Sequence, residues 1–408
     1  AQQGGLWTLG CLAKVVLLNT LYAIFSFTQT VKNQKVLAVT LLCSSTISFY
    51  TANYTLSKMH QVYDQIINLV KNSISNINDN HVQFSDSNYK PFNFDKNNFH
   101  EINEINNNQK IAFIDGGSSE IIKSSNFSLN LIRVYYTIYQ NNKRIMAKKQ
   151  EFYAFAHTKD VDDELYYNVE FINNEKNKIG LDKNDLLLSS LDETIKQGIV
   201  RANISNMSNV IRRFSELKTA AMIIDELKNN DIIVLDGSLQ CTFTNEKKYF
   251  EELYKKAMEK NIIVCGLSKT TTLMTDKGNS IANALSKFNI QGKWLYHPIA
   301  EIKSNEHKAE MAFVKLHEKS KYIFRFELYK EQKQHLNDVI SLLANNCKDP
   351  VFIGYPYGLI EADKNARISN QEKDMLLTLF STKFGKDWEK IKESLSNIDA
   401  HEILDSIS

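Results

Sequence analysis

The spacing of apolar positions divides the chain into segments with different expected structures. Two apolar runs, Val15 to Phe27 and Val36 to Tyr50, open the sequence, and each is shorter than the roughly 20 residues that span a bilayer. The sequence starts at Ala1 and not at Met, so a weak membrane hairpin, a signal-like segment and material foreign to the native fold are alternatives. We predict that residues 1–55 are an appendage with no transmembrane role and that residues 56–408 form one domain.

The stretch from Leu56 to Ser119 predicts a helix, a loop and a buried strand in turn. Apolar positions between Leu56 and Val70 recur at helical spacing. Residues 76–109 are rich in Asn, Asp and Lys, which predicts an exposed, mobile loop. The apolar run Ile111 to Ile114 leads straight into Asp-Gly-Gly-Ser-Ser, which predicts a buried strand that ends at a turn.

The next segments predict a meander and then alternating helices and strands. Ser128 to Tyr139, Ile145 to His157 and a short Asn168 to Asn173 are rich in β-branched and aromatic residues, as strands are. Leu186 to Leu227 has helical spacing, with an Asn-rich weak point near residues 203–209.

Two further strands complete the predicted sheet. Ile232 to Leu235 predicts the fourth strand, Lys247 to Lys260 an amphipathic helix, and Ile262 to Gly266 the fifth strand. Three antiparallel strands followed by alternating helix and parallel strand is the order of a ribonuclease-H-like α/β fold. We therefore expect a mixed sheet flanked by helices, with a helical insertion and a C-terminal extension.

The C-terminal extension has its own predicted elements. Met311 to Leu316 and Tyr322 to Leu328 predict a hairpin, and Glu331 to Asn346 predicts a helix. From Pro350 the sequence predicts a strand, a Gly/Pro turn and the start of a helix that carries two carboxylates. Acidic residues near a helix start also complement the helix dipole, so this pattern alone does not indicate a site.

Two aspartates stand at the ends of predicted buried strands. Asp115 and Asp236 each follow an apolar run and precede a glycine. A buried charge is costly unless it is paired, and a metal ion or a phosphate-bearing ligand would be a suitable partner, although Asp-Gly is also common in ordinary turns. In the predicted fold their strands are neighbours, so we expect both carboxylates to point at one site.

Composition and charge remove several classes of function. Of 408 residues, 43% are hydrophobic, which suffices for a core, and the net charge of +2 excludes a polycationic nucleic-acid-binding tail. The five cysteines contain no Cys-x-x-Cys pair, which argues against a zinc site or a disulfide framework and favours a cytoplasmic location. No Walker-type Gly-Lys-Ser/Thr loop occurs, so any ATP-driven motor would be a partner.

Five short motifs follow one another along the chain: Ile114-Asp-Gly-Gly-Ser118, Leu235-Asp-Gly-Ser-Leu239, Val264-Cys-Gly-Leu-Ser-Lys-Thr270, Phe324-Arg-Phe-Glu-Leu328 and Gly354-Tyr-Pro-Tyr-Gly-Leu-Ile-Glu-Ala-Asp363. In this order they resemble the NurA nucleases, DNA-end-processing enzymes of archaea and bacteria that work with the HerA translocase. The resemblance implies a manganese-dependent deoxyribonuclease of the single-strand endonuclease and five-prime exonuclease type. It also implies a homodimer that acts in end resection with a HerA-type hexameric ATPase.

The resemblance also implies a set of metal ligands. Asp115 and Asp236 match the family's two aspartates, and a glutamate is expected on the helix before the second of them, for which Glu216 is the first candidate and Glu226 the second. Asp363 stands where many relatives carry a histidine, and a carboxylate there suits a hard divalent ion. The implied cofactor is Mn²⁺, with Mg²⁺ as the alternative, bound as two ions.

Basic and titratable residues are further candidates. Lys269, after the fifth strand, is either a contact of the scissile phosphate or a solvated loop lysine. The remaining candidates are the cations Arg144, Lys148, Lys149, Arg212, Arg213 and Arg325, for the DNA backbone, and the histidines His297, His307 and His317. Most surface charges and most single histidines are structural, so we rank these residues below Lys269.

Three other functions fit parts of the sequence. An actin-like ATPase or phosphotransferase also has Asp-Gly after its first strand, but it needs a second Gly-rich phosphate turn and an adenosine-site glycine pair, and no Gly-Gly pair follows Gly117. A catalytically inactive partner subunit of a translocase is the second alternative, against which the intact aspartates argue. A membrane-attached structural protein is the third, and it rests only on the N-terminal apolar runs.

Overall fold

The computed structural model describes residues 58–73, 78–105, 108–172, 180–392 and 395. The chain divides into two compact units, Ala1–Asn78 and Asp79–Ser408. In the first unit, residues 58–73 form the helix that the apolar spacing predicts. The predicted appendage of residues 1–55 lies outside the described residues, so its status stays a prediction. Across the described ranges, no helix is both long enough and apolar enough to cross a membrane.

The second unit contains fifteen strands and six α-helices among the described residues. The strands are β1 (Val82–Gln83), β2 (Tyr89–Pro91), β3 (Phe99–Glu101), β4 (Lys110–Lys123), β5 (Phe127–Gln140), β6 (Lys143–Val161), β7 (Glu164–Ile172), β8 (Leu188–Ser189), β9 (Ile232–Asp236), β10 (Ile263–Ser268), β11 (Met274–Thr275), β12 (Trp294–Tyr296), β13 (Ala300–Ile302), β14 (Ala309–Lys315) and β15 (Phe324–Tyr329). The helices are α3 (Met207–Ile223), α4 (Glu246–Lys260), α5 (Ile281–Ser286), α6 (Leu336–Asn345), α7 (Tyr357–Ala366) and α8 (Asn370–Phe384).

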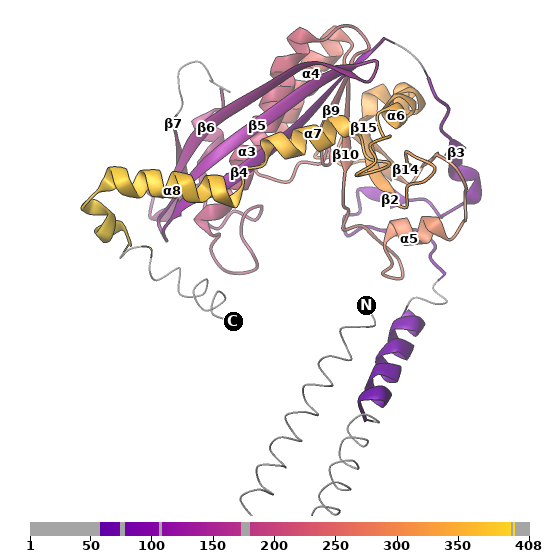
Figure 1. The fold of residues 1–408 in the computed structure, drawn as a ribbon, viewed down its shortest axis with the longest axis horizontal. Coiled ribbons are helices and arrows are strands. Elements are labelled where there is room, and N and C mark those ends of the chain that lie inside the picture. Colours follow the sequence, from indigo (N-terminus) through magenta and orange to yellow (C-terminus); the bar gives the residue numbers. More distant parts are fainter. Residues whose placement is uncertain (1–57, 74–77, 106–107, 173–179, 393–394, 396–408) are drawn as a thin grey trace, which may run out of the picture. The chain divides into compact units, whose positions relative to one another are not determined.

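The central sheet confirms the predicted strand order (Figure 1). Its eleven strands lie in the order β3-β12-β14-β15-β10-β9-β4-β5-β6-β7-β8. β4, β5 and β6 form the antiparallel meander, and β9 and β10 continue the sheet parallel to β4. This is the ribonuclease-H-like arrangement, and the predicted hairpin of β14 and β15 extends it antiparallel beyond β10.

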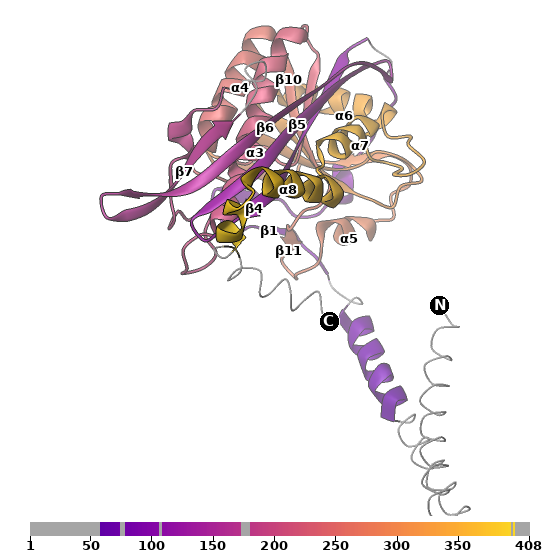
Figure 2. The same cartoon turned by 60° about the vertical axis from the view of Figure 1, so that its left-hand side comes forward.

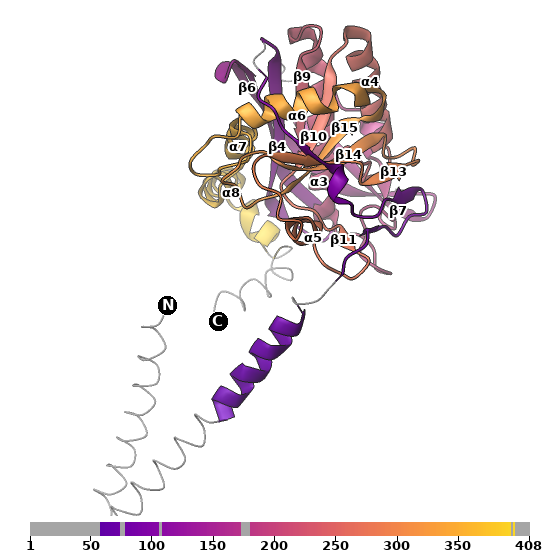
Figure 3. The ribbon, with the colours of Figure 1, turned by 90° about the vertical axis from the view of Figure 1, so that its right-hand side faces the viewer.

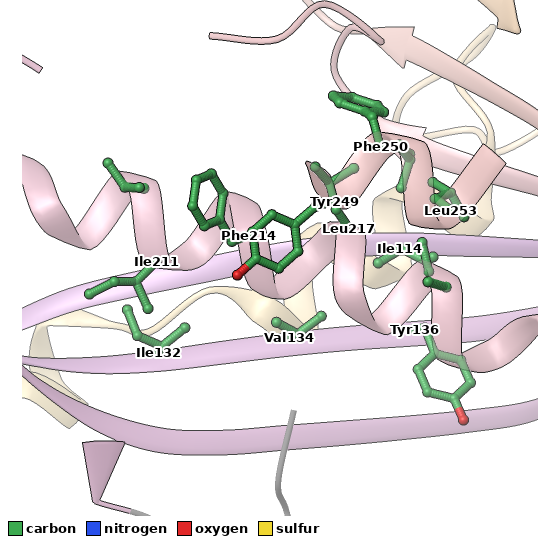
Figure 4. Close-up of a cluster of buried hydrophobic side chains, with 14 of the residues drawn as sticks. Ile114, Ile132, Val134, Tyr136, Ile211, Phe214, Leu217, Tyr249, Phe250 and Leu253 are labelled. Atoms are coloured by element: carbon green, nitrogen blue, oxygen red, sulfur yellow. The ribbon is translucent and has the colours of Figure 1, made fainter. Parts of the chain in front are cut away.

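Alternate residues of the central strands enter two different cores, because successive strand side chains point to opposite faces. On one face Ile114 packs with α3 and α4 residues that include Phe214 and Phe250 (Figure 4). On the other face Phe113 packs with residues of α6 and α7, such as Leu359. Figure 2 shows α8 on the face of the sheet opposite α3. The sheet is thus covered by helices on both faces, as predicted.

Smaller cores complete the unit. A third cluster joins the α5 region to the strands at the β3 and β12 edge, and it includes Val82, Tyr89 and Trp294. Figure 3 shows α5 beside β11 in this part of the unit. A fourth cluster places Leu376 of α8 against Ile122 and neighbouring residues at the far ends of β4 and β5.

Two predicted elements are wrong. The segment from Leu186 to about residue 203 is not helical: it forms the end of a short 3-10 helix, β8 and turns, and α3 begins only at Met207. The side chain of Asn203 accepts a hydrogen bond from the Ser205 amide, so it starts a new turn where the periodic pattern suggested continuity. Residues 350–355 form turns and not a strand, and Val351 is 92% exposed.

Two other predicted boundaries need correction. The segment 76–109 is not only a loop, because it contains β1, β2 and β3, and Val82 and Tyr89 enter the third cluster. The predicted turn after Asp115 is also wrong. β4 continues through this Gly-Gly-Ser-Ser segment to Lys123, because β5 pairs with it along the whole length.

Candidate active site

The parallel register of β4 and β9 places two aspartates side by side. Ile114 pairs with Leu235, so the next residues in register are Asp115 and Asp236. The residue two positions earlier in each strand packs in the core beneath α6 and α7, and side chains at positions i and i+2 share a face. Both carboxylates therefore lie on the face of the sheet that α7 covers. Figure 1 shows α7 lying along β4 and β5.

Two glycines allow α7 to approach β4 closely. A Cβ atom at Gly358 would stand 2.0 Å from the ring of Phe113, and a Cβ atom at Gly117 would stand 2.0 Å from the carbonyl oxygen of Ala366. Another residue would require α7 to move at Gly117, and α7 or the Phe113 ring to move at Gly358, because real Cβ atoms essentially never approach within 3.0 Å. The Gly-Gly after Asp115 thus serves helix packing and not a turn.

Three carboxylates and one ammonium group form the centre of the site. One oxygen each from Asp115, Asp236 and Asp363 all lie within 4.8 Å of one another. Lys269 places its Nζ 2.6 Å from Asp236 Oδ2 and 2.6 Å from Asp363 Oδ1. β10 is parallel to β9 with Leu267 opposite Asp236, so a residue two positions further reaches both carboxylates.

Burial and like charge disturb the ionisation of this centre. Asp115 is 8% exposed, and burial together with the charges of Asp236 and Glu216 raises its pKa to about 8, while Lys269 opposes the rise. Burial is the largest cause of this shift and the neighbouring carboxylates add to it, so a cation bound here would offset both effects. Carboxylate oxygens in this number are the ligands that hard divalent cations prefer. The donor set therefore fits a divalent metal ion.

The two glutamates considered as a helix ligand lie in different surroundings. Glu216 is buried on α3 and forms ion pairs with two arginines of the same helix. Burial raises its pKa, although both arginines oppose this effect. It lies near enough to affect Asp115, but within the described ranges it is not one of the three converging carboxylates. Glu226 contacts a tyrosine of β5 and a lysine of β6 instead.

Two buried side chains hold the loop that follows Asp236. Nη2 of Arg213 donates a hydrogen bond to the Ser238 carbonyl oxygen at 2.7 Å. The Leu239 amide donates to Oε2 of Glu327, also at 2.7 Å, and Glu327 is fully buried. These contacts fix the backbone immediately after a predicted metal ligand. The sequence offered no role for Glu327 beyond its place in the Phe-Arg-Phe-Glu-Leu motif.

Tyr355 lies in the site but was not singled out from the sequence. Its hydroxyl forms a long hydrogen bond of 3.4 Å to Asp236 Oδ1, and Lys269 Nζ lies 5.9 Å from the centre of its ring. Burial and then the charges of Asp236 and Asp115 raise its pKa, so the hydroxyl stays protonated and donates. The only signal was its position in the Gly/Pro motif that precedes α7.

Most other candidates are engaged in contacts within the protein. Glu361 accepts hydrogen bonds from Tyr135 and Tyr139 and pairs with Arg144, on a different side of α7 from Asp363. The remaining pairs are Lys148–Glu226, Lys149–Glu151, Arg212–Glu216, Arg213–Glu216, Arg325–Glu327, His297–Glu310 and His307–Glu327. His317 accepts a hydrogen bond from a nearby backbone amide. Across the described residues, no histidine joins the carboxylate group.

The chain matches one protein-family model and is similar to solved structures of nucleases. The family model for the NurA domain matches residues 109–368. The crystal structure of the NurA nuclease from Sulfolobus solfataricus is similar at 15% identity over 82% of this chain and 98% of that chain, with a TM-score of 0.44. The catalytic domain of human endonuclease V is similar at 8% identity over 67% of this chain and 84% of that chain, with a TM-score of 0.34. No curated protein matches the chain.

Proposed function

Because this chain belongs to the NurA family of nucleases, we propose that it is a metal-dependent deoxyribonuclease that hydrolyses phosphodiester bonds at DNA ends. The observation that carries this proposal is the convergence of Asp115, Asp236 and Asp363, from β4, β9 and α7, to within 4.8 Å. The family argues against an actin-like ATPase. An inactive partner subunit remains the alternative that experiment must decide.

The three aspartates would hold Mn²⁺ or Mg²⁺, and Glu216 is the candidate for a fourth ligand. We expect two ions, which when bound supply an activated water and neutralise charge on the phosphate and on the leaving oxygen. Buried Asp115 fits such a role, because a cation beside it would offset both the burial and the neighbouring negative charges that raise its pKa.

The other residues of the site would bind the phosphate of the substrate or hold the metal ligands in position. The Lys269 ammonium group, which contacts Asp236 and Asp363, would bind a non-bridging phosphate oxygen. Tyr355 would orient Asp236 through its hydroxyl, and Arg213 and Glu327 would keep the following loop in place. Such supporting contacts set ligand geometry, and their loss typically costs about 10- to 100-fold in metal affinity or activity.

The assay that tests this function uses labelled single-stranded and double-stranded DNA with Mn²⁺, Mg²⁺ or EDTA. We expect cleavage with Mn²⁺, weaker or equal cleavage with Mg²⁺ and none with EDTA. Purified protein that binds DNA but cleaves nothing under any of these conditions would support the inactive-subunit alternative and contradict the proposal.

We also propose a HerA-type hexameric ATPase as the partner and a homodimer as the working form, in DNA end resection. The sequence contains no Walker-type loop of its own, so movement along DNA needs a separate motor. A cognate HerA should co-purify with the protein or stimulate its cleavage. If it changes neither binding nor cleavage, this partnership is wrong.

A further inference from the structure

Lys269 lies where a shared metal ion would have to bind. Its Nζ is 2.6 Å from one oxygen of Asp236 and 2.6 Å from one oxygen of Asp363. Lys269 therefore already forms ion pairs with two of the three converging carboxylates. The side chain is 33% exposed, so it is neither locked in the core nor free in solvent.

An ammonium group and a metal ion cannot share this position. Mn²⁺ and Mg²⁺ bind carboxylate oxygens at about 2.0–2.2 Å, which is close to the distance that Nζ keeps from the same oxygens. Two cations so close together, with charges of one and two, would repel strongly at the low effective dielectric of a half-buried site. An ion that binds both Asp236 and Asp363 must therefore displace the Lys269 ammonium group.

The local structure allows this displacement. Lys269 is the first residue after β10, and residues 269–273 form no regular element, so its side chain can turn without breaking sheet pairing. A flexible lysine chain can then carry the charge a few ångströms to a new partner. A phosphate group placed beside the carboxylates would be such a partner.

We propose that Lys269 is a placeholder cation, which neutralises Asp236 and Asp363 until a metal ion displaces it onto a phosphate of the bound nucleic acid. This inference rests on the proposed metal site. It has two measurable consequences. Lys269 lowers the intrinsic metal affinity of the protein, and a bound phosphate raises that affinity because it holds the displaced lysine. The coupling must be reciprocal, as for any two linked ligands.

The test is a Mn²⁺ titration, followed by the electron paramagnetic resonance signal of free Mn²⁺, for wild type, Lys269→Met and Lys364→Met. Lys364 is an exposed lysine next to Asp363 on α7, so its variant removes the same charge without removing the bridge. We expect Lys269→Met to bind Mn²⁺ about tenfold more tightly than wild type, which corresponds to a partly exposed ion-pair bridge. Lys364→Met should stay within about twofold of wild type.

The same titrations are repeated with thymidine 3′,5′-bisphosphate. This ligand should tighten Mn²⁺ binding by wild type more than by Lys269→Met, because its phosphate oxygens can ligate the ion in both proteins but can hold a displaced lysine only in wild type. An equal gain in both proteins would contradict the proposed coupling. If Lys269→Met proves unstable, Lys269→Gln replaces it, and the shift of its melting temperature with Mn²⁺ serves as the second readout.

The outcomes separate the two claims. If wild type binds Mn²⁺ and Lys269→Met binds it equally or more weakly, the placeholder role is wrong while the metal site stands. If neither protein binds Mn²⁺, the proposed metal site fails and the placeholder role fails with it.

Discussion

Gly358→Ala adds one carbon atom and should separate α7 from the sheet. The new Cβ atom would stand 2.0, 2.3 and 2.5 Å from three ring atoms of Phe113, whereas ordinary contact begins at 3.4 Å. The helix or the ring must therefore move by about 1.4 Å, the difference between 3.4 and 2.0 Å. Overpacking of this kind costs about 1–3 kcal/mol, and the better helix propensity of Ala recovers only about 1 kcal/mol.

The displacement matters because α7 carries Asp363. Functional sites tolerate shifts of about 0.5 Å, so a helix that moves by about 1.4 Å would displace Asp363 by more than this tolerance. We expect Gly358→Ala to lower Mn²⁺ affinity and cleavage by about 10- to 100-fold. The net loss of stability, which is the difference between these two terms, should be about 0–2 kcal/mol.

Urea unfolding, Mn²⁺ titration and DNA cleavage measure these effects. Lys364→Ala, on the exposed side of the same helix, is the matched control and should behave like wild type. Phe113→Leu should partly rescue Gly358→Ala, because the smaller side chain leaves room for the new atom, so the two changes should show favourable coupling. Wild-type Mn²⁺ affinity in Gly358→Ala, or no rescue by Phe113→Leu, would refute the packing argument.

Three other predictions address single elements. Asp363→Ala should lose most cleavage and need more Mn²⁺ for the remainder, and Asp363→His should retain more cleavage than Asp363→Ala. Glu361→Ala should affect Mn²⁺ dependence least, because the partners of Glu361 lie on another side of α7. Equal Mn²⁺ curves for Asp363→Ala and wild type would show that Asp363 is only a charge near the helix start and not a metal ligand. Burial alone raises the pKa of Glu327, but Arg325 and His307 lower it to about 2. The ionised Glu327 therefore contributes its full stabilisation above about pH 4.3, and this contribution is lost as the pH falls toward 2. The free energy of unfolding of wild type should fall more steeply with pH in that window than that of Glu327→Gln, and identical slopes would contradict this. Deletion of residues 1–55 should leave folded, active protein, and lost activity or aggregation of the shortened chain would show that this segment is needed.

Much of the sheet was accessible from the sequence, because its strands are apolar runs with clear boundaries. Ile111 to Ile114 and Ile232 to Leu235 are buried as expected, and the order of strands and helices sufficed to make them neighbours. The position of Asp115 beside Asp236 follows from that order. Both aspartates nevertheless stay proposed metal ligands until their variants are tested.

The contacts of α7 could not be predicted from the sequence in the same way. They depend on the absence of side chains at Gly117 and Gly358, which the sequence presents as turn residues. The predicted helix at Leu186–Leu188 was wrong for a related reason. Leu186 of a 3-10 helix and Leu188 of a short strand are both buried, and their spacing resembles that of a helix. Tertiary packing, and not the local sequence pattern, determined the secondary structure of these segments.

The arginines of α3 are a case in which a simple rule of helix geometry suffices. Arg212 and Arg213 were candidates for DNA contacts, but both pair with Glu216. Their positions, four and three residues before Glu216, are the spacings at which opposite charges on a helix meet. Helical spacing in the sequence therefore suffices to predict both ion pairs with Glu216.

The most direct test of the proposed metal centre compares Asp115→Asn and Asp236→Asn with Asp374→Asn, which changes an exposed aspartate on α8. Each protein is assayed for Mn²⁺ binding and for cleavage of labelled DNA, and its melting temperature is recorded. We expect the two site variants to keep a folded structure but to lose Mn²⁺ binding and cleavage, while Asp374→Asn keeps both. Wild-type cleavage by either folded site variant would contradict the claim that these aspartates form the metal centre of a nuclease.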